Sequence, residues 1–232
     1  MPPPRAFTLA EVLITLGIIG IVASLTIPSL IEKQKEKAIV AKLKKFYSSF
    51  SQAYQMAINE HGTIDNWGLA DTAWTDDNTD FTDDAKKGKA DFMEIVLKYY
   101  TGRKYNKNSS TYTLQDGISI ALPQLTIKSC EQNTVSSCGS FRVDLTGNNK
   151  NINQSFLFGI YKHKVVPFGT YFDSWFYYDH NMVDNAFRRD CGGNHVHCTA
   201  WVIYNENMDY LHCIDDLSWF GAKSCKEAKA KK

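Results

Sequence analysis

Glu11 is the one ionisable side chain in the long apolar run between Phe7 and Ile31. A charged side chain inside a membrane-spanning helix costs on the order of 2.5 to 3.5 kcal/mol unless a nearby group neutralises it. The run itself contains no cation. Glu11 therefore predicts an ion pair with a positive group that comes from outside the run.

Six cysteines form a second group of chemically reactive residues, and all of them lie in the C-terminal half of the chain. An even number confined to one region is typical of disulfides formed in an oxidising compartment, so this part of the chain is expected outside the cytoplasm. Sequence alone leaves other connectivities open. Pairing of near neighbours predicts the disulfides Cys130–Cys138, Cys191–Cys198 and Cys213–Cys225.

The segment "CGGNHVHC" also offers four potential zinc ligands within a short distance, at Cys191, His195, His197 and Cys198. The two histidines are two positions apart, which suits neither one face of a helix nor the usual spacing of a structural zinc site. A disulfide between the two cysteines is the simpler interpretation, and no metal or other cofactor is expected.

Two acidic segments raise the question of calcium. The stretch 71–84 is rich in aspartate, and Asp144, Thr146 and Asn148 alternate as calcium ligands do. The stretch 71–84 lacks the alternating ligand pattern and the glycine of an EF-hand loop. In the second segment Gly147 comes too early, and no glutamate follows at the required distance. A solvated loop and an ordinary turn are the better interpretations.

A continuous helix is predicted from about Phe7 to His61. Its first part is apolar on all sides, and Gly62 ends the pattern. Pro28 lacks an amide hydrogen and is expected to kink or locally melt the helix. The second part has one apolar face, formed by residues at three- and four-residue steps: Ile39, Val40, Leu43, Phe46, Tyr47, Phe50, Tyr54, Ala57 and Ile58.

Shorter elements follow the long helix. The apolar spacing of residues 89–100 predicts an amphipathic helix. Asp116-Gly117 favours a tight turn between two strands, whereas residues 199–204 are compatible with a strand or a helix. The fold class is therefore α+β, with the long helix packed on an antiparallel sheet. The predicted strands are 111–114, 118–122, 140–145, 155–161 and 164–168.

The apolar run is long enough to cross a membrane. At about 1.5 Å per residue, residues 7–31 form roughly 37 Å of helix, which exceeds a bilayer core of about 30 Å. The run is too long for the apolar region of a secretory signal peptide. The formal net charge of +1 for the whole chain argues against a nucleic-acid binder.

The segment "FTLAEVLITLGIIGIVASLTIP" resembles the N-terminal segment of type IV pilins and type II secretion pseudopilins. The resemblance implies cleavage between Ala6 and Phe7 by a prepilin peptidase, followed by methylation of the new Phe7 amine. It also implies that Glu11 attracts the Phe7 amine of a neighbouring subunit. The family usually has glycine before the cut, where this chain has Ala6.

Other residues of the same run suit helix packing in a filament. Gly17 and Gly20 would let neighbouring helices approach closely, and Pro28 lies near the end of the run as in the family. The implied partners are other pilin or pseudopilin subunits, the prepilin peptidase and an inner-membrane assembly platform.

The distribution of lysines opposes the expected topology. Arg5 alone precedes the span, and six lysines follow it between residues 33 and 45. Counting positive charges would keep the C-terminal part inside the cell, whereas the cysteines and the pilin-like segment place it outside. The cysteine pattern and the pilin-like segment are the more specific signals.

The sequence thus predicts a structural filament subunit and not an enzyme, since it has no phosphate loop, nucleophile elbow or H-E-x-x-H motif. Its expected location is the bacterial inner membrane, then a periplasmic pseudopilus or an extracellular pilus. The alternative is a membrane-anchored binding module that does not polymerise, with Trp175 to Tyr178 as an exposed patch in place of core. The predicted regions are a leader (1–6), a transmembrane helix (7–31), an amphipathic helix (32–62) and a globular domain (63–232).

Overall fold

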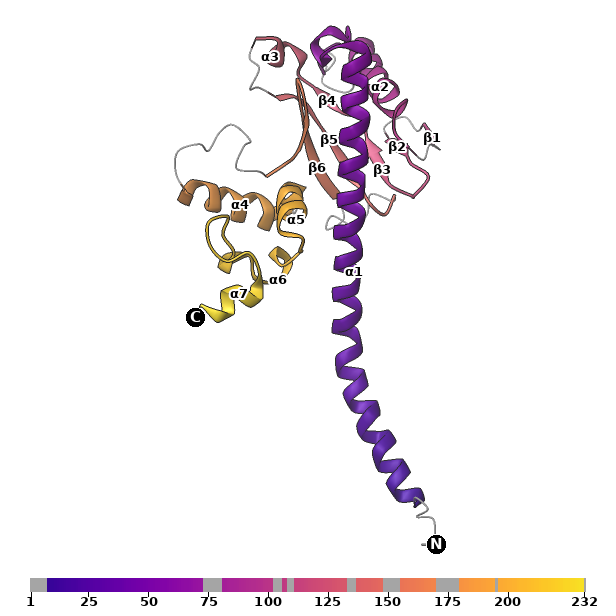
Figure 1. Ribbon diagram of the computed structural model, residues 1–232, viewed down its shortest axis with the longest axis vertical. Helices are drawn as coiled ribbons and strands as arrows, with labels where there is room; N and C mark the ends of the chain where they lie inside the picture. Colours follow the sequence, from indigo (N-terminus) through magenta and orange to yellow (C-terminus); the bar gives the residue numbers. More distant parts are fainter. Residues whose placement is uncertain are drawn as a thin grey trace. The chain divides into compact units, whose positions relative to one another are not determined.

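The computed structural model describes residues 8–72, 81–101, 106–107, 111–132, 137–147, 155–169, 180–194 and 196–231 (Figure 1). The chain divides into two compact units, residues 1–38 and residues 39–232. They are called here the N-terminal unit and the globular unit. The boundaries predicted at residues 6, 31 and 62 stay predictions.

Helix α1 runs from Leu9 to His61 and contributes to both units. It ends where predicted, because Gly62 adopts a positive φ of 78° and its amide bonds the Ile58 carbonyl at 2.8 Å. It begins at Leu9, two residues later than the predicted start at Phe7. The chain stays helical through Pro28, so local melting does not occur there.

The globular unit contains a sheet in which all paired strands are antiparallel, as predicted. The strand order is β1-β2-β3-β5-β6-β7, and β4 pairs with β5. Two of these strands, β1 and β4, were not predicted. The strands are β1 (Asn106–Lys107), β2 (Thr111–Thr113), β3 (Ser119–Ala121), β4 (Gln124–Leu125), β5 (Ser137–Asp144), β6 (Ser155–Tyr161) and β7 (Val165–Pro167).

The turn between β2 and β3 forms at the predicted Asp-Gly pair. Gly117 has φ of 77°, and the Leu114 amide bonds the Ile118 carbonyl at 2.8 Å. The Asp116 carboxylate accepts a bond from the Ile118 amide, which holds the turn closed. Glycine fits here because the left-handed backbone costs it no side-chain clash.

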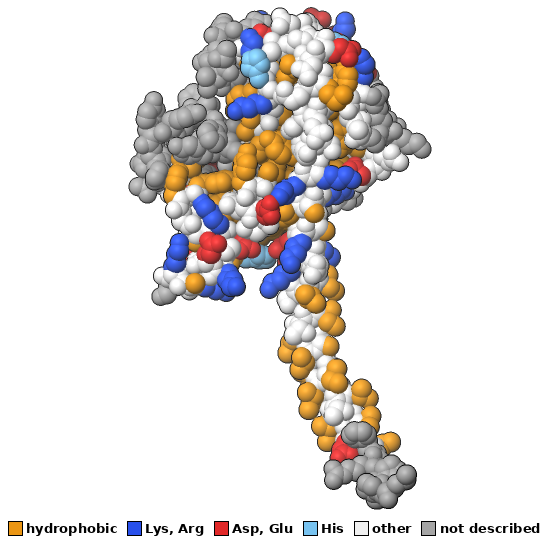
Figure 2. All heavy atoms as spheres, in the orientation of Figure 1, with side chains coloured by type: hydrophobic (Ala, Val, Ile, Leu, Met, Phe, Trp, Pro, Cys, Tyr) orange, Lys and Arg blue, Asp and Glu red, His pale blue; other side chains and the backbone are white. Residues whose placement is uncertain are grey.

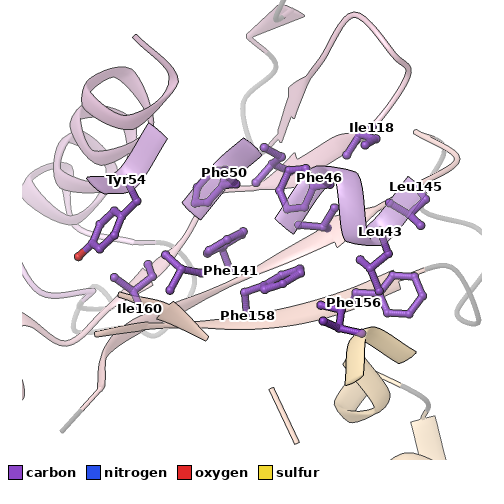
Figure 3. Close-up of a cluster of buried hydrophobic side chains, with 14 of the residues drawn as sticks. Leu43, Phe46, Phe50, Tyr54, Ile118, Phe141, Leu145, Phe156, Phe158 and Ile160 are labelled. Atoms are coloured by element: carbon purple, nitrogen blue, oxygen red, sulfur yellow. The ribbon is translucent and has the colours of Figure 1, made fainter. Parts of the chain in front are cut away.

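The second half of α1 packs on the sheet through aromatic side chains (Figure 3). The ring of Phe50 lies 4.7 Å from that of Phe141 on β5, and the ring of Phe46 lies 5.7 Å from that of Phe158 on β6. All four side chains are buried. The predicted α+β arrangement, with one apolar helix face on an antiparallel sheet, is therefore confirmed.

Polar bonds at the edges of this interface fix the helix on the strands. The Tyr54 hydroxyl donates to the Tyr161 carbonyl at 2.8 Å, and the Tyr47 hydroxyl donates to the Val165 carbonyl at 3.2 Å. Burial raises the pKa of Tyr47 to about 12 and also raises that of Tyr54. Both phenols therefore remain protonated donors at neutral pH.

The other elements of the globular unit that the structure describes are helices. Helix α2 overlaps the predicted amphipathic segment 89–100 but begins earlier, where the Thr82 hydroxyl caps it by accepting from the Ala85 amide, and ends earlier, at Leu97. Residues 199–204, left open by the sequence, are helical. The helices are η1 (Ile64–Asn66), α2 (Asp83–Leu97), α3 (Ile127–Gln132), α4 (His180–Asn194), η3 (Val196–Cys198), α5 (Thr199–Asn205), α6 (Tyr210–Cys213), η4 (Ile214–Asp216) and α7 (Cys225–Ala230).

Three disulfides join the pairs expected from sequence proximity: Cys130–Cys138, Cys191–Cys198 and Cys213–Cys225. The first connects α3 to β5, and the other two lie among the C-terminal helices. These helices are also tied together by Asn207, whose side chain accepts from Trp201 Nε1 at 3.1 Å and donates to the Lys223 carbonyl at 3.0 Å. Covalent and polar links thus hold together a region of short helices.

Candidate functional site

The N-terminus of α1 is a capping box formed by Thr8 and Glu11. Glu11 Oε2 accepts the Thr8 amide at 2.8 Å and the Thr8 hydroxyl at 2.9 Å. In return, the Glu11 amide donates to the Thr8 hydroxyl oxygen at 3.3 Å. Reciprocal bonds of this kind satisfy amide groups that a helix start leaves unpaired.

This cap changes the geometry expected around Glu11. The helix starts at Leu9 and Thr8 directly precedes it, so Glu11 lies in the first turn of the helix and its carboxylate turns back to the residue before that turn. Among the described residues, Glu11 Oε1 makes no hydrogen bond, whereas Oε2 accepts both bonds from Thr8. The carboxylate is held by one oxygen and can bind a cation from another chain through the other.

Sequence reasoning missed Thr8 as a separate functional residue and treated it only as part of the pilin-like motif. The available signal was the pattern Thr-x-x-Glu directly before an apolar run, which is the sequence signature of a capping box. Ala6 and Phe7, the residues of the predicted cut and methylation, lie outside the described residues.

The first half of α1 exposes many apolar side chains, and those on one face are visible in Figure 2. Leu9 is 80% exposed, Leu25 is 75% exposed, and none of the apolar stretch is buried. Within the described residues, α1 is the one helix that is long and apolar enough to cross a membrane. A surface this apolar requires lipid or other helices around it.

Gly17 and Gly20 lie within this exposed stretch, and no contact within the described part of the chain explains why these two positions are glycine. A Cβ atom built at either position would meet no atom within 4 Å. Neither glycine has a positive φ, so the backbone does not require glycine there. Both residues leave room for another helix to approach the backbone closely.

Pro28 lies within the same stretch, where neighbouring side chains bond to the helix backbone. The Thr26 hydroxyl donates to the Val22 carbonyl at 3.0 Å, and the Ser29 hydroxyl donates to the Thr26 carbonyl at 3.0 Å. Such bonds keep side-chain polar groups satisfied inside an apolar environment. They allow the hydroxyl groups of this run to enter a membrane.

The alternative metal sites are accounted for by other interactions. Cys191 and Cys198 are joined in a buried disulfide and so are not thiolate ligands. His197 packs against Phe168 with ring centroids 4.9 Å apart, and His195 lies outside the described residues. Among the described residues, no group of three or more potential ligands lies close enough to hold a metal ion.

The acidic segments considered for calcium serve as caps. Asp144 Oδ1 accepts the Thr146 amide and the Thr146 hydroxyl, each at 2.6 Å. Asp71 accepts the Lys128 amide at 3.2 Å. Asp144 therefore closes a local turn, whereas Asp71 caps the first turn of α3 from a distant part of the chain. Residues 73–80, Asn148 and the aromatic run 175–178 lie outside the described residues.

Comparison with known proteins divides the chain close to the end of its apolar run. Residues 1–27 match the prokaryotic N-terminal methylation motif, and residues 29–208, well over half of the chain, match a family of unknown function, DUF6613. No curated protein and no solved structure matches the chain. The chain therefore belongs to the family DUF6613 and carries the N-terminal segment of a type IV pilin-like prepilin.

Proposed function

We propose that this protein is a structural filament subunit of a type IV pilus or a type II secretion pseudopilus. The observation that carries the proposal is the part of α1 from Leu9 to Ile31, an exposed apolar surface in which Glu11 is the one charged side chain. In this proposal, prepilin peptidase cuts between Ala6 and Phe7, the Phe7 amine is methylated, and the helices of successive subunits pack together.

Glu11 is assigned the role of an assembly residue. Its free Oε1 faces no donor among the described residues, and a carboxylate in lipid is costly without a counter-ion. The Phe7 amine of a neighbouring subunit would supply that counter-ion and would set the axial register between helices. Gly17 and Gly20 would then lie where neighbouring backbones approach.

The globular unit is assigned a structural and not a catalytic role, on the outer surface of the filament. Its three disulfides support a location outside the cytoplasm, because such bonds persist in an oxidising compartment. The proposed route begins in the bacterial inner membrane, where an assembly platform takes up the processed subunit. It ends in a periplasmic pseudopilus or an extracellular pilus.

Mass spectrometry of the mature chain tests the processing step. The proposal expects an N-terminal peptide that begins with N-methylated Phe7. An intact Met1, or a cut at any position other than Ala6–Phe7, would instead support a membrane-anchored protein that does not polymerise.

Substitution of Glu11 tests the assembly step. Glu11→Gln retains a side chain that completes a capping box but removes its charge. We expect this variant to insert in the membrane but to yield filaments at less than about one-tenth of the wild-type amount. The reason is that the Phe7 amine of the neighbouring subunit would be left as an unpaired charge in lipid. Normal filament yield from Glu11→Gln would remove the charge of Glu11 from the mechanism.

A further inference from the structure

Six lysines follow the apolar run on α1. Two of them form bonds to groups of the globular unit. Lys42 Nζ donates to the Leu145 carbonyl at 2.5 Å, and Lys44 pairs with the Glu206 carboxylate. Glu206 ends α5 in a left-handed conformation with φ of 56°. These two lysines therefore have structural partners within the chain.

Three lysines at the end of the N-terminal unit, Lys33, Lys35 and Lys37, have no such role; they are called here the lysine cluster. All three are exposed. No hydrogen bond or ion pair joins them to any other part of the chain that the structure describes. Three exposed ammonium groups in five residues are thus available to a partner outside the chain.

The lysine cluster begins directly after the exposed apolar run, which ends at Ile31. With a rise of about 1.5 Å per residue, Lys33 lies about 3 Å and Lys37 about 9 Å beyond Ile31 along the helix axis. At 3.6 residues per turn, Lys33 and Lys37 share one face and Lys35 lies on the other side. The cluster therefore places ammonium groups on two sides of the helix, at the depth of the lipid headgroups of a membrane that the apolar run would span.

The neighbouring acids offset this charge only in part. Glu32 and Glu36 alternate with the lysines, so residues 32–37 carry three positive and two negative charges. Glu36 is half-buried and makes an interaction of its own. The long lysine stems can extend along apolar surface and bring their ammonium groups to phosphate oxygens.

We propose that the lysine cluster binds the phosphate groups of anionic phospholipids in the leaflet nearest the globular unit. The inference rests on the proposed membrane insertion of α1. It does not depend on which side of the membrane the globular unit occupies, because the cluster follows the span in either orientation. Juxtamembrane lysines are attracted to anionic headgroups within about one Debye length, roughly 10 Å at moderate salt.

Spin-labelled lipids provide the test. The full-length chain is reconstituted in phosphatidylcholine vesicles, and the association of labelled phosphatidylglycerol with the protein is compared with that of labelled phosphatidylcholine. We expect the wild-type protein to prefer phosphatidylglycerol. The variant with Lys33→Gln, Lys35→Gln and Lys37→Gln should lower that preference about threefold or more, and high salt should weaken the wild-type preference.

A matched variant removes the same charge elsewhere. Lys226→Gln, Lys229→Gln and Lys231→Gln change three exposed lysines at α7 and the residue that follows it, and they should leave the preference unchanged. An unchanged preference in the cluster variant, or an equal loss in both variants, would overturn the proposal. Crosslinking between subunits gives a further outcome. If the cluster variant keeps the normal lipid preference but no longer crosslinks to neighbouring subunits, the lysine cluster binds protein, and the proposal is overturned.

Flotation separates this inference from the proposed function. The wild-type chain should float with vesicles of phosphatidylcholine alone, because the apolar run needs no anionic lipid to insert. Failure to float contradicts membrane insertion itself. Flotation without any preference for phosphatidylglycerol contradicts only the role of the lysine cluster.

Discussion

Both halves of α1 carry large apolar side chains, but these side chains differ in what surrounds them. Leu9 in the first half is 80% exposed, whereas Leu43 in the second half is fully buried in the core of the globular unit. Burying a leucine side chain contributes about 1.5 to 3 kcal/mol. The second half therefore stabilises the subunit, while the first half is left for lipid or other subunits.

The largest expected effect is in the buried half. Phe50→Ala should lower the unfolding free energy of the globular unit by about 3 to 5 kcal/mol, because it leaves a cavity beside Phe46 and Phe141. Urea unfolding of the full-length chain in detergent, followed by tryptophan fluorescence, measures this loss. The matched change Ile18→Ala, at an exposed position, should not alter that transition. Equal losses from both changes would contradict the division of α1.

The disulfides should affect only the globular unit. Replacing Cys213 and Cys225 together by serine opens a bridge between residues 12 apart in sequence, and about 2 to 4 kcal/mol of stability should be lost. Membrane insertion should be unchanged, as measured by flotation. A variant that unfolds normally but no longer floats would show that the two parts of the chain are not independent.

The ion pair between Asp65 and Lys162 should make the globular unit sensitive to acid. Burial opposes ionisation of Asp65, but the Lys162 ammonium 2.5 Å away, together with hydrogen bonds from Thr63 and the backbone, outweighs this effect and lowers the pKa of the carboxyl group. The pair thus stabilises the fold above the unfolded-state pKa of about 3.9, and this stability is lost as pH falls through the lower folded-state pKa.

Asp65→Asn tests this pH dependence. At neutral pH it should cost about 1.5 to 3 kcal/mol, the usual size of a hydrogen bond to a charged group. Between about pH 5 and pH 2 its unfolding free energy should change less than that of the wild type. Parallel curves for the two proteins over this range would assign the acid sensitivity to other groups.

The smallest expected effect on stability is in the exposed half. Thr8→Ala removes the cap of α1 and should cost about 0.5 to 2 kcal/mol of local helix stability, with no change in the urea transition of the globular unit. Hydrogen exchange of the first helical turn measures the local loss. Comparison with Glu11→Gln separates the cap from the charge: if Thr8→Ala assembles normally, the cap does not position Glu11 for assembly.

Strong local patterns were predicted correctly from the sequence. The end of α1 at Gly62, the Asp116-Gly117 turn and the antiparallel strands follow from periodicity and from glycine backbone preferences. The short strand β4 was missed, because it is defined by its partner. Gly139 on β5 approaches it so closely that a Cβ atom would lie 2.2 Å from the Gln124 carbonyl oxygen.

The C-terminal helices show a second limit of sequence patterns. The first five residues of α5, 199–203, are all buried, so they show no alternation of apolar and polar positions that would reveal a helical period. Its start is bonded to distant residues: the Thr199 hydroxyl accepts the Leu157 amide at 2.8 Å, and the Ala200 amide bonds the Phe168 carbonyl at 3.0 Å. A segment buried on all sides takes its conformation from such partners.

The sequence by itself determined the apolar run, the single charge at Glu11 and the nearness of the paired cysteines, because each depends on residue type and local spacing. Only the tertiary structure decided which half of α1 is covered and which lysines the fold uses. Each of these depends on groups that meet in space, such as Lys44 and Glu206, and local spacing carries no information about them.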